Sequence, residues 1–269
     1  MKRWRLARKV VQVAALAFFL TPLLGAKFVS GTMASSTVFG LVLSDPLAAL
    51  QVLAGTRDLA GNLAVSALIV LVVYAVLRRA FCAWACPVNL ILEPLESLRV
   101  RLKLKDRVTQ APDLKYWILG GILALSAALA LPVYEMVSPV SILMRNLLFG
   151  FGPEIGALAT IIILDILVAR RFWCRSLCPL GAFYSLTGKL SPLAPRITSG
   201  CTGCASCREA CPMGEWILDE VVSRRGGPVR SGECSLCGEC LDECPRNAIG
   251  ITFGPGRNQT EVEVRTGAG

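Results

Sequence analysis

Eight cysteines in the last third of the chain repeat one spacing twice, C-x2-C-x2-C-x3-C-P. The first run is Cys201, Cys204, Cys207 and Cys211, and the second run is Cys234, Cys237, Cys240 and Cys244. Three thiolates in so short a loop can surround one [4Fe-4S] cube, while a fourth comes from the paired run. The proline after each run prevents the chain from continuing as a helix. The doubled spacing therefore predicts two [4Fe-4S] clusters.

Each cluster is expected to take its fourth ligand from the other run, as in bacterial-type ferredoxins. One cluster is predicted to bind Cys201, Cys204, Cys207 and Cys244. The other is predicted to bind Cys234, Cys237, Cys240 and Cys211. A disulfide framework and a pair of zinc sites are the alternatives. Zinc sites normally pair C-x2-C knuckles across a spacer, and the chain has no histidine to complete mixed sites.

The composition of the whole chain points to a membrane protein. Its 269 residues are 54% hydrophobic and 17% charged, with a mean hydropathy of +0.58, which is too apolar for a soluble domain of this size. Because histidine is absent, bis-histidine haem, histidine-bound zinc or copper, and histidine general-base catalysis are excluded. We expect redox chemistry based on cysteine and iron, with no haem.

Four apolar stretches are predicted to be transmembrane helices, each near the roughly 20 residues that a bilayer requires. They cover about residues 10–26, 59–77, 114–133 and 154–169. Lys and Arg gather before the first stretch, between the second and third, and after the fourth, whereas the other connections hold only Lys27, Arg57 and Arg145. This bias predicts a multi-pass membrane protein with both termini and the clusters in the cytoplasm. A secretory signal peptide is the alternative for the first stretch.

The apolar region contains an internal duplication. The segment R-R-x-aromatic, followed by C-x3-C-P, occurs with Cys82 and Cys86 and again 92 residues later with Cys174 and Cys178. Upstream, residues 44–47 resemble residues 137–140 at an offset of 93. Each half is predicted to contain a helix, an outer loop with a short Pro-initiated helix, and a returning helix. The halves are then parallel repeats about an axis along the membrane normal.

The role of Cys82, Cys86, Cys174 and Cys178 stays open at this point. Cysteines at positions i and i+4 lie on one face of a helical turn, where they suit a shared ligand or a dithiol. The four together are candidates for an additional metal or cluster, or for a thiol relay. Alternatively, they are small apolar residues that pack at helix ends.

The chain thus divides into regions of different character. Residues 1–191 are predicted to form the four-helix membrane domain, 192–200 a linker, 201–253 a small α+β ferredoxin domain and 254–269 a flexible tail. Within the ferredoxin domain we expect a short helix at residues 215–222 and a strand at 248–253. Residues 1–199 carry a net charge of +12 and residues 200–269 a net charge of −3, so the acidic domain is expected to rest on the basic face. Nucleic acid is not needed to explain the basic charge.

This combination of four spans, two C-x3-C-P motifs and the doubled cluster run resembles the NapH and MauN type of membrane-bound ferredoxin proteins. It is more distantly similar to the membrane part of NosR-type proteins. The resemblance implies a quinol dehydrogenase component that passes electrons from the quinol pool toward a periplasmic reductase, as in a nitrate-reductase-like system. It also implies a location in the bacterial inner membrane, with membrane lipid and quinone as surroundings, and an iron–sulfur or cytochrome redox partner. The alternatives are an assembly factor that reduces a metal or thiol with cytosolic electrons, and a cluster-bearing anchor without turnover.

Quinol oxidation requires a proton acceptor, and without histidine the candidates are carboxylates and tyrosines. Apart from Glu154 at the outer edge of the fourth stretch, Asp165 is the only acid inside a predicted span, and it is the candidate proton acceptor. An ion pair with Arg170 is the structural alternative for this residue.

Overall fold

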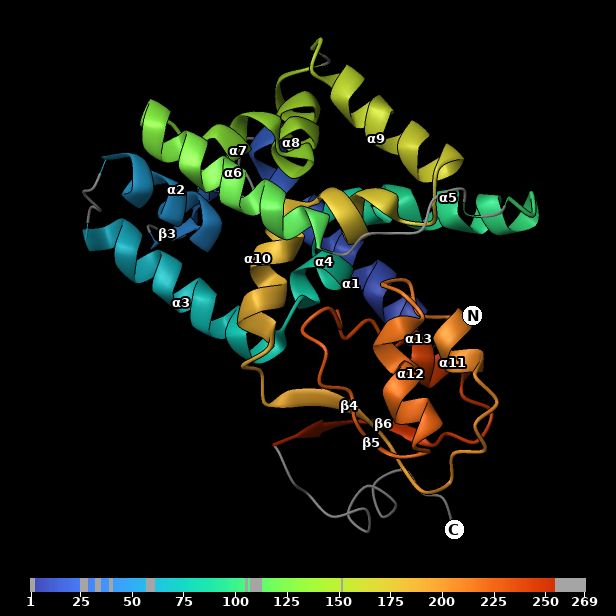
Figure 1. Cartoon of the computed structure of the whole chain (residues 1–269). Coiled ribbons are helices and arrows are strands. Elements are labelled where there is room, and N and C mark those ends of the chain that lie inside the picture. Colours follow the sequence, from blue (N-terminus) through green and yellow to red (C-terminus); the bar gives the residue numbers. More distant parts are fainter. Residues whose placement is uncertain are drawn as a thin grey trace. The chain divides into compact units, whose positions relative to one another are not determined.

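The computed structural model describes residues 3–24, 29–31, 35–38, 41–56, 61–104, 106, 113–150 and 152–254. Within these residues the chain is mainly helical and contains two three-stranded antiparallel sheets (Figure 1). It divides into two compact units, each assembled from segments that are far apart in the sequence. The predicted flexible tail lies outside the described residues apart from Gly254.

The first unit contains both cysteine runs and combines Met1–Val10, Tyr74–Trp84 and Tyr184–Gly269. Its sheet has the order β5-β4-β6, with β4 in the centre and antiparallel to both neighbours. The elements after residue 190 are β4 (Leu193–Ile197), α11 (Ser206–Glu209), α12 (Trp216–Ser223), β5 (Gly227–Pro228), α13 (Glu239–Glu243) and β6 (Ile249–Phe253).

Two local predictions in this unit are confirmed. The predicted strand at residues 248–253 is β6, and the predicted helix at 215–222 is α12. Helix α12 buries Ile217, Leu218, Val221 and Val222, which recur at helical spacing and give it an apolar face. The segment predicted as a linker, residues 192–200, contains the central strand β4. Pro195 lies within that strand, and its carbonyl accepts a hydrogen bond from Val229 N at 2.8 Å.

The second unit combines Val11–Val73 and Ala85–Phe183. The helices that lie wholly or mainly in it are α1 (Arg3–Leu20), α2 (Pro46–Thr56), α3 (Gly61–Leu77), α5 (Pro87–Arg101), α6 (Leu114–Leu129), α7 (Val133–Val137), α8 (Pro139–Phe149) and α9 (Ile155–Leu167). The 3-10 helix η1 (Thr21–Leu24) is followed by a β1-β2-β3 sheet of Val29–Gly31, Ser35–Val38 and Leu41–Ser44. The π-helix η2 (Trp173–Leu177) then leads into α10 (Pro179–Gly188).

Proline marks the same helix starts in both sequence repeats. Helices α2 and α8 begin at Pro46 and Pro139, and α5 and α10 begin at Pro87 and Pro179. Proline suits the first helical position because its missing N–H would have no intrahelical partner there. The short Pro-initiated helix predicted in each repeat is therefore confirmed.

The prediction of four transmembrane helices is wrong for the described residues. None of their helices is both long and apolar enough to cross a membrane. Helices α3, α6 and α9 have 17, 16 and 13 residues, and the first turns of the 18-residue α1 carry several arginines. Left-handed residues end two of the apolar stretches, Arg78 after α3 (φ 56°) and Ala130 after α6 (φ 53°). Hydropathy marked these stretches correctly as apolar but does not show where such a residue ends the helix.

Candidate functional site

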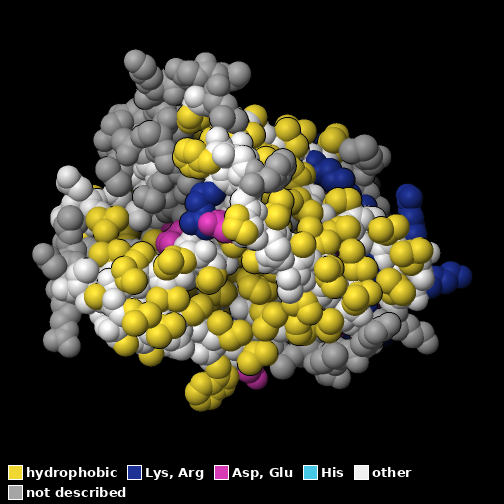
Figure 2. Space-filling model, turned by 90° about the horizontal axis from the view of Figure 1, so that it is seen from above, with side chains coloured by type: hydrophobic (Ala, Val, Ile, Leu, Met, Phe, Trp, Pro, Cys, Tyr) yellow, Lys and Arg dark blue, Asp and Glu magenta, His cyan; other side chains and the backbone are white. Residues whose placement is uncertain are grey.

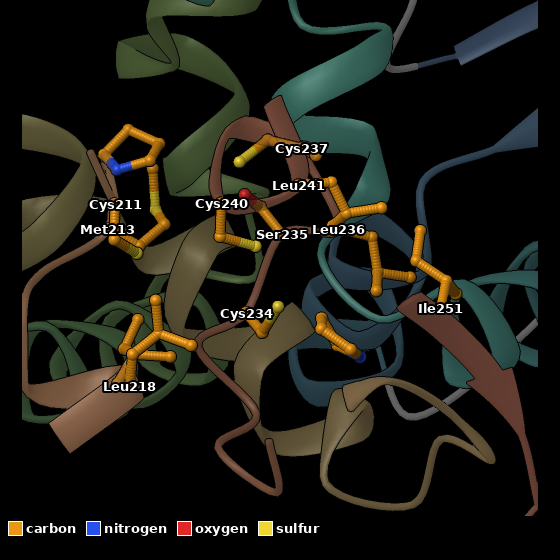
Figure 3. A pocket seen from close by; sticks show the side chains of 14 residues that line it. Cys211, Met213, Leu218, Cys234, Ser235, Leu236, Cys237, Cys240, Leu241 and Ile251 are labelled. Atoms are coloured by element: carbon orange, nitrogen blue, oxygen red, sulfur yellow. The ribbon is translucent and has the colours of Figure 1, made fainter. Parts of the chain in front are cut away.

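Four cysteines from the two runs surround one pocket in the first unit (Figure 3). Cys234, Cys237 and Cys240 come from the second run, and Cys211 comes from the end of the first. The remaining walls are largely apolar and include Met213, Leu218, Leu236, Leu241 and Ile251. The structure thus brings together the ligand set predicted for one cluster.

A second pocket in the same unit is lined by the other predicted set. Cys201, Cys204 and Cys207 come from the first run, and Cys244 comes from the end of the second. Cys204 is exposed and Cys207 is buried, so this pocket has one side that water reaches. Each pocket therefore combines three cysteines of one run with the last cysteine of the other, which is the arrangement expected from bacterial-type ferredoxins.

The backbone of the two loops has the same unusual conformation. Gly203 and Leu236, each just before the second cysteine of its run, have φ values of 74° and 50°. Ala205 and Gly238, each just after that cysteine, have φ values of 63° and 77°. Left-handed residues alternating with ordinary ones form concave nests of N–H groups, which bind anions and iron–sulfur centres. Both loops are therefore shaped for an anionic group rather than for a regular element.

Burial, and after it the neighbouring thiols, raises the pKa values of several cysteines that line the pockets. Burial, followed by the nearby Cys237 sulfur, raises the pKa of Cys211 to about 12. Burial also raises the pKa of Cys234 to about 11. The Cys207 pKa is raised by burial and then by Cys244 and Cys201, which belong to the same pocket. Metal binding must displace these protons, so ligand binding here is coupled to proton release.

The ligand set and spacing fit two [4Fe-4S] clusters better than mononuclear sites. All eight candidate ligands are cysteines, the usual ligands of such clusters. Among the described residues, no three Cys, Asp or Glu side chains are grouped closely enough to hold a single metal ion. A tetrahedral zinc site would require thiolates about 2.3 Å from one common centre.

The second run is held by the N-terminal turn of α1. Arg8 and Arg5 pair with Glu239 at 2.6 and 2.8 Å, and Arg8 Nη1 donates to Cys237 O at 3.2 Å. The Asp242 carboxylate accepts from the backbone N–H groups of Trp4 and Arg5. Such a carboxylate at a helix N-terminus satisfies N–H groups that lack intrahelical partners.

The segment after α3 contacts the same run within the first unit. Arg79 pairs with Glu233, which also accepts from Ser185 Oγ at 2.7 Å. Helix α4 (Ala80–Trp84) provides Trp84, whose Nε1 donates to Leu236 O at 3.1 Å. The sequence marks Arg8 only as one of the basic residues before the first apolar stretch, and Arg79 as part of the repeated R-R segment. The R-R pair before C-x3-C-P was a sequence signal that could have suggested a further role.

Three of the four C-x3-C-P cysteines lie in the second unit. Cys86 and Cys174 pack against the cluster of Val88, Leu92 and Val140. Burial raises the Cys174 pKa well above its usual value. Cys178 N–H bonds to Trp173 O at 2.9 Å, and its Sγ accepts from Gly181 N at 3.4 Å. These contacts support a role in packing and helix capping for the three cysteines. An additional cluster or a thiol relay stays a prediction. The fourth cysteine, Cys82, lies in the first unit.

Asp165 is buried on α9, and its two carboxylate oxygens have different surroundings. Its Oδ1 accepts from Trp173 N at 2.9 Å, whereas Oδ2 is buried without a hydrogen-bond partner. Burial raises the Asp165 pKa to about 6, against the opposing effects of the Trp173 N–H and nearby arginines. The expected alternative, an ion pair with Arg170, is not what the structure contains, since Arg170 pairs with Glu96.

Glu96 is the centre of a charged network that sequence analysis missed. Its carboxylate binds both Arg170 and Arg171, and its pKa falls to about 2 because these two cations outweigh burial. Arg171 also donates to Asn89 Oδ1. Arg171 has a φ of 52°, so the second residue of this R-R pair is left-handed, whereas in the first R-R pair the left-handed residue is the first one, Arg78. The network joins α5 to the segment after α9.

Comparison with known proteins agrees with the two cysteine pockets and with the internal duplication. The family described as "4Fe-4S binding domain" matches residues 59–105 and again residues 151–198, which confirms the internal duplication. The "4Fe-4S dicluster domain" matches residues 200–249, the part that contains both cysteine runs. No solved structure matches the chain.

Named relatives cover most of the chain. MauN of Methylorubrum extorquens, a methylamine utilization ferredoxin-type protein, is 38% identical over 93% of this chain and 89% of its own length. MauN of Paracoccus denitrificans is 34% identical, covering 86% and 83% of the two chains. The ferredoxin-type protein NapH of Escherichia coli is 34% identical, covering 78% and 75%.

Two cysteine pockets, the matching families and these relatives define an iron–sulfur electron-transfer protein of the ferredoxin type. Within that class, the chain belongs to the family of the MauN and NapH ferredoxin-type proteins.

Proposed function

We propose that the chain is the electron-transfer component of a quinol dehydrogenase and holds one [4Fe-4S] cluster in each crossed cysteine set. Quinol loses two electrons and two protons on oxidation, whereas such clusters carry electrons one at a time. Two neighbouring one-electron sites therefore suit a two-electron donor. The observation that carries the proposal is the pairing of each three-cysteine loop with the last cysteine of the other run.

Asp165 is the proton acceptor in this proposal. A carboxyl group whose pKa is about 6 can accept a proton near neutral pH, where an ordinary carboxylate is a weaker base. Its Oδ2 is buried and has no hydrogen-bond partner, so protonation of this oxygen breaks no existing bond. The Oδ1 bond to Trp173 N holds the carboxylate in place.

Quinols are dissolved in lipid, and an apolar helix face supports contact with a bilayer. Val65, Leu68, Ile69, Val72 and Val73 recur at helical spacing on α3, and each side chain is 45–60% exposed. Figure 2 shows hydrophobic side chains over much of the visible face. Large exposed apolar patches mark protein or membrane contacts, and we assign this one to lipid of the bacterial inner membrane. The cytoplasmic side suits the thiols and clusters because that compartment is reducing.

The acceptor we propose is a periplasmic reductase, as in a nitrate-reductase-like system, reached through an iron–sulfur or cytochrome partner. The NapH and MauN names describe ferredoxin-type proteins, and the MauN names add methylamine utilization. They support electron transfer to another protein as the shared role.

The test uses full-length protein purified anaerobically. We expect about eight irons and eight sulfides per chain, as two [4Fe-4S] clusters require. Adding a menaquinol or ubiquinol analogue should then produce the EPR signal of reduced clusters. Reduction by a cytosolic donor without any response to quinol would instead indicate an assembly factor. If neither donor reduced the clusters, the chain would be a cluster-bearing anchor. Asp165→Asn should slow reduction by quinol, whereas the exposed control Asp113→Asn should not.

A further inference from the structure

Arg78 is a buried cation directly after α3 and beside the second cysteine run. Its residue surface is only 3% exposed, and its φ of 56° is unusual for a residue with a side chain. Its Nη1 donates to Val229 O at 3.0 Å and to Ser231 O at 2.9 Å. Both carbonyls lie within five residues of Cys234. The strained backbone therefore places a guanidinium at the entrance to the cysteine loop.

Helix α10 packs so closely against Arg78 and Gly232 that glycine is required at the contacts. A Cβ on Gly188 would lie 3.3 Å from Arg78 Cβ, and one on Gly232 would lie 2.2 Å from Ser185 O. Helix α10 therefore passes close to both Arg78 and the chain that leads into the second run. Such tight packing limits the movement of the guanidinium and keeps water from screening it.

The positive charge of Arg78 is not neutralised by a carboxylate. The other buried cations around this loop have acidic partners, because Arg79 pairs with Glu233 and Arg8 with Glu239. In the part of the chain that the structure describes, no carboxylate forms an ion pair with Arg78, and its Nε has no hydrogen-bond partner. One positive charge is thus left over beside Cys234.

Arg78 and Cys234 influence each other in the expected directions. Burial lowers the pKa of Arg78, and the Cys234 thiolate opposes that effect. In return, Arg78 and Arg79 oppose the increase that burial causes in the Cys234 pKa. The guanidinium therefore acts on the negative charge of a cysteine that lines the pocket.

The pocket formed by the other set has a different electrostatic environment. Its Cys204 is exposed, and the cation that lines it, Arg246, is exposed as well. Water screens charges at such a site, so the same positive charge has less effect there than in a buried site.

We propose that Arg78 is a positioning residue that makes the reduction potential of the cluster held by Cys211, Cys234, Cys237 and Cys240 higher than that of the other cluster. The inference rests on the proposed function, because it requires both clusters. A four-thiolate cluster is an anion and becomes more negative by one charge on reduction, so a buried cation stabilises the reduced form more than the oxidised form. An electron from quinol then resides preferentially on the site beside Arg78. The exposed set around Cys204 is the site that exchanges electrons with a water-soluble redox protein.

The experiment is an EPR redox titration of the anaerobically purified full-length protein and three variants. Arg78→Gln removes the charge but keeps a hydrogen-bond donor, Arg78→Lys keeps the charge, and Arg246→Gln is the matched control at the other pocket. We expect Arg78→Gln to shift one of the two potentials to a more negative value and to leave the other unchanged. Arg78→Lys and Arg246→Gln should stay near the wild type. Unchanged potentials in Arg78→Gln, or an equal shift of both, would overturn the proposal.

A second measurement covers the case in which Arg78→Gln fails to fold. In the wild type, a soluble paramagnetic ion should broaden mainly the EPR signal of the cluster on the Cys204 side, which water reaches. The less broadened signal should have the higher potential, and equal potentials or the reverse order would overturn the inference. Iron analysis separates this failure from that of the proposed function: wild-type protein without iron would overturn both, whereas about eight irons with indistinguishable potentials would overturn only the role of Arg78.

Discussion

Glu96 and Arg171, 75 positions apart in the sequence, form a buried ion pair with 2.6 Å between Oε2 and Nε. Arg170 binds the other carboxylate oxygen, so one acid receives two cations from consecutive residues. The acid belongs to the helix that follows the first C-x3-C motif, and the cations belong to the R-R pair of the second. The two R-R pairs thus have different surroundings, since the first pair contacts Val229 and Glu233, which lie just before the second cysteine run.

Glu96→Gln should destabilise the protein at neutral pH by about 3 kcal/mol, because it removes the anion that pairs with the buried Arg171 and the partly exposed Arg170. The pH dependence has a defined sign. The folded pKa of about 2 is below the ordinary value of 4.5, so the stabilisation is complete above about pH 5 and is lost as the pH falls toward 2. Urea unfolding between pH 7 and pH 3 measures both effects.

The control for this prediction is an exposed pair of the same type. Glu220 and Arg224 are 70% and 73% exposed, so Glu220→Gln should change the free energy of unfolding by less than about 0.5 kcal/mol. Equal effects of the two substitutions would show that the Glu96 network contributes no more than an ordinary surface pair.

The Asp165 carboxyl group should affect stability with the opposite pH dependence, and Asp165→Asn should remove this effect. The folded pKa of about 6 is above the ordinary value of 3.8, so the folded state binds the proton more tightly, and stability falls as the pH rises from about 4 to above 6. Asparagine keeps an oxygen for the Trp173 N–H but cannot ionise. The variant should therefore be more stable than the wild type at pH 8, by up to about 3 kcal/mol, and similar at pH 4. Thermal melting at both pH values checks this, and a wild-type melting temperature that does not change with pH would contradict it.

The crossed pockets were predictable because three cysteines of each pocket lie within seven consecutive residues and the ferredoxin pattern places the fourth in the other run. The α12 helix and the β6 strand were predictable for a similar reason, since their apolar residues follow local periods. The contacts of Arg8, Arg78 and Trp84 join segments more than 150 positions apart, and no local pattern encodes such pairs. The end of α3 at Leu77 agrees with the predicted stretch, whereas α6 ends inside its predicted stretch because the left-handed conformation of Ala130 depends on tertiary packing.

Alanine substitutions of the cysteines should separate the crossed arrangement from an uncrossed one. If Cys211 serves the second loop, Cys211→Ala should remove the same EPR signal as Cys237→Ala and leave the signal that depends on Cys204. Cys244→Ala and Cys204→Ala should form the other matching pair. Each variant should lose about half of its iron. A shared loss in Cys211→Ala and Cys204→Ala would mean that each run holds its own cluster.

Gly238→Ala should disturb the second loop more than an ordinary glycine substitution. Gly238 has a φ of 77°, and an added Cβ would lie 2.7 Å from Trp4. Backbone strain and the clash together should cost about 2–4 kcal/mol and lower the iron content of the cluster beside Arg78. Gly226→Ala is the matched control in the same unit, since its Cβ would meet nothing closer than 3.8 Å.

The contact between Trp4 and Gly238 can be tested further with a second substitution. Trp4→Ala in the Gly238→Ala background should recover part of the lost stability, because the contacts of the added Cβ with the Trp4 ring atoms Cγ and Cδ2 disappear, while its contact with Cβ and the backbone strain stay. The measurement is a double-mutant cycle by chemical unfolding, with iron content as the second readout. If the two substitutions had strictly additive effects on the free energy of unfolding, Trp4 and the residue at position 238 would not interact. A positive coupling would instead show that the first residues of the chain hold the loop that carries Cys237 and Cys240 in its ligand-binding shape.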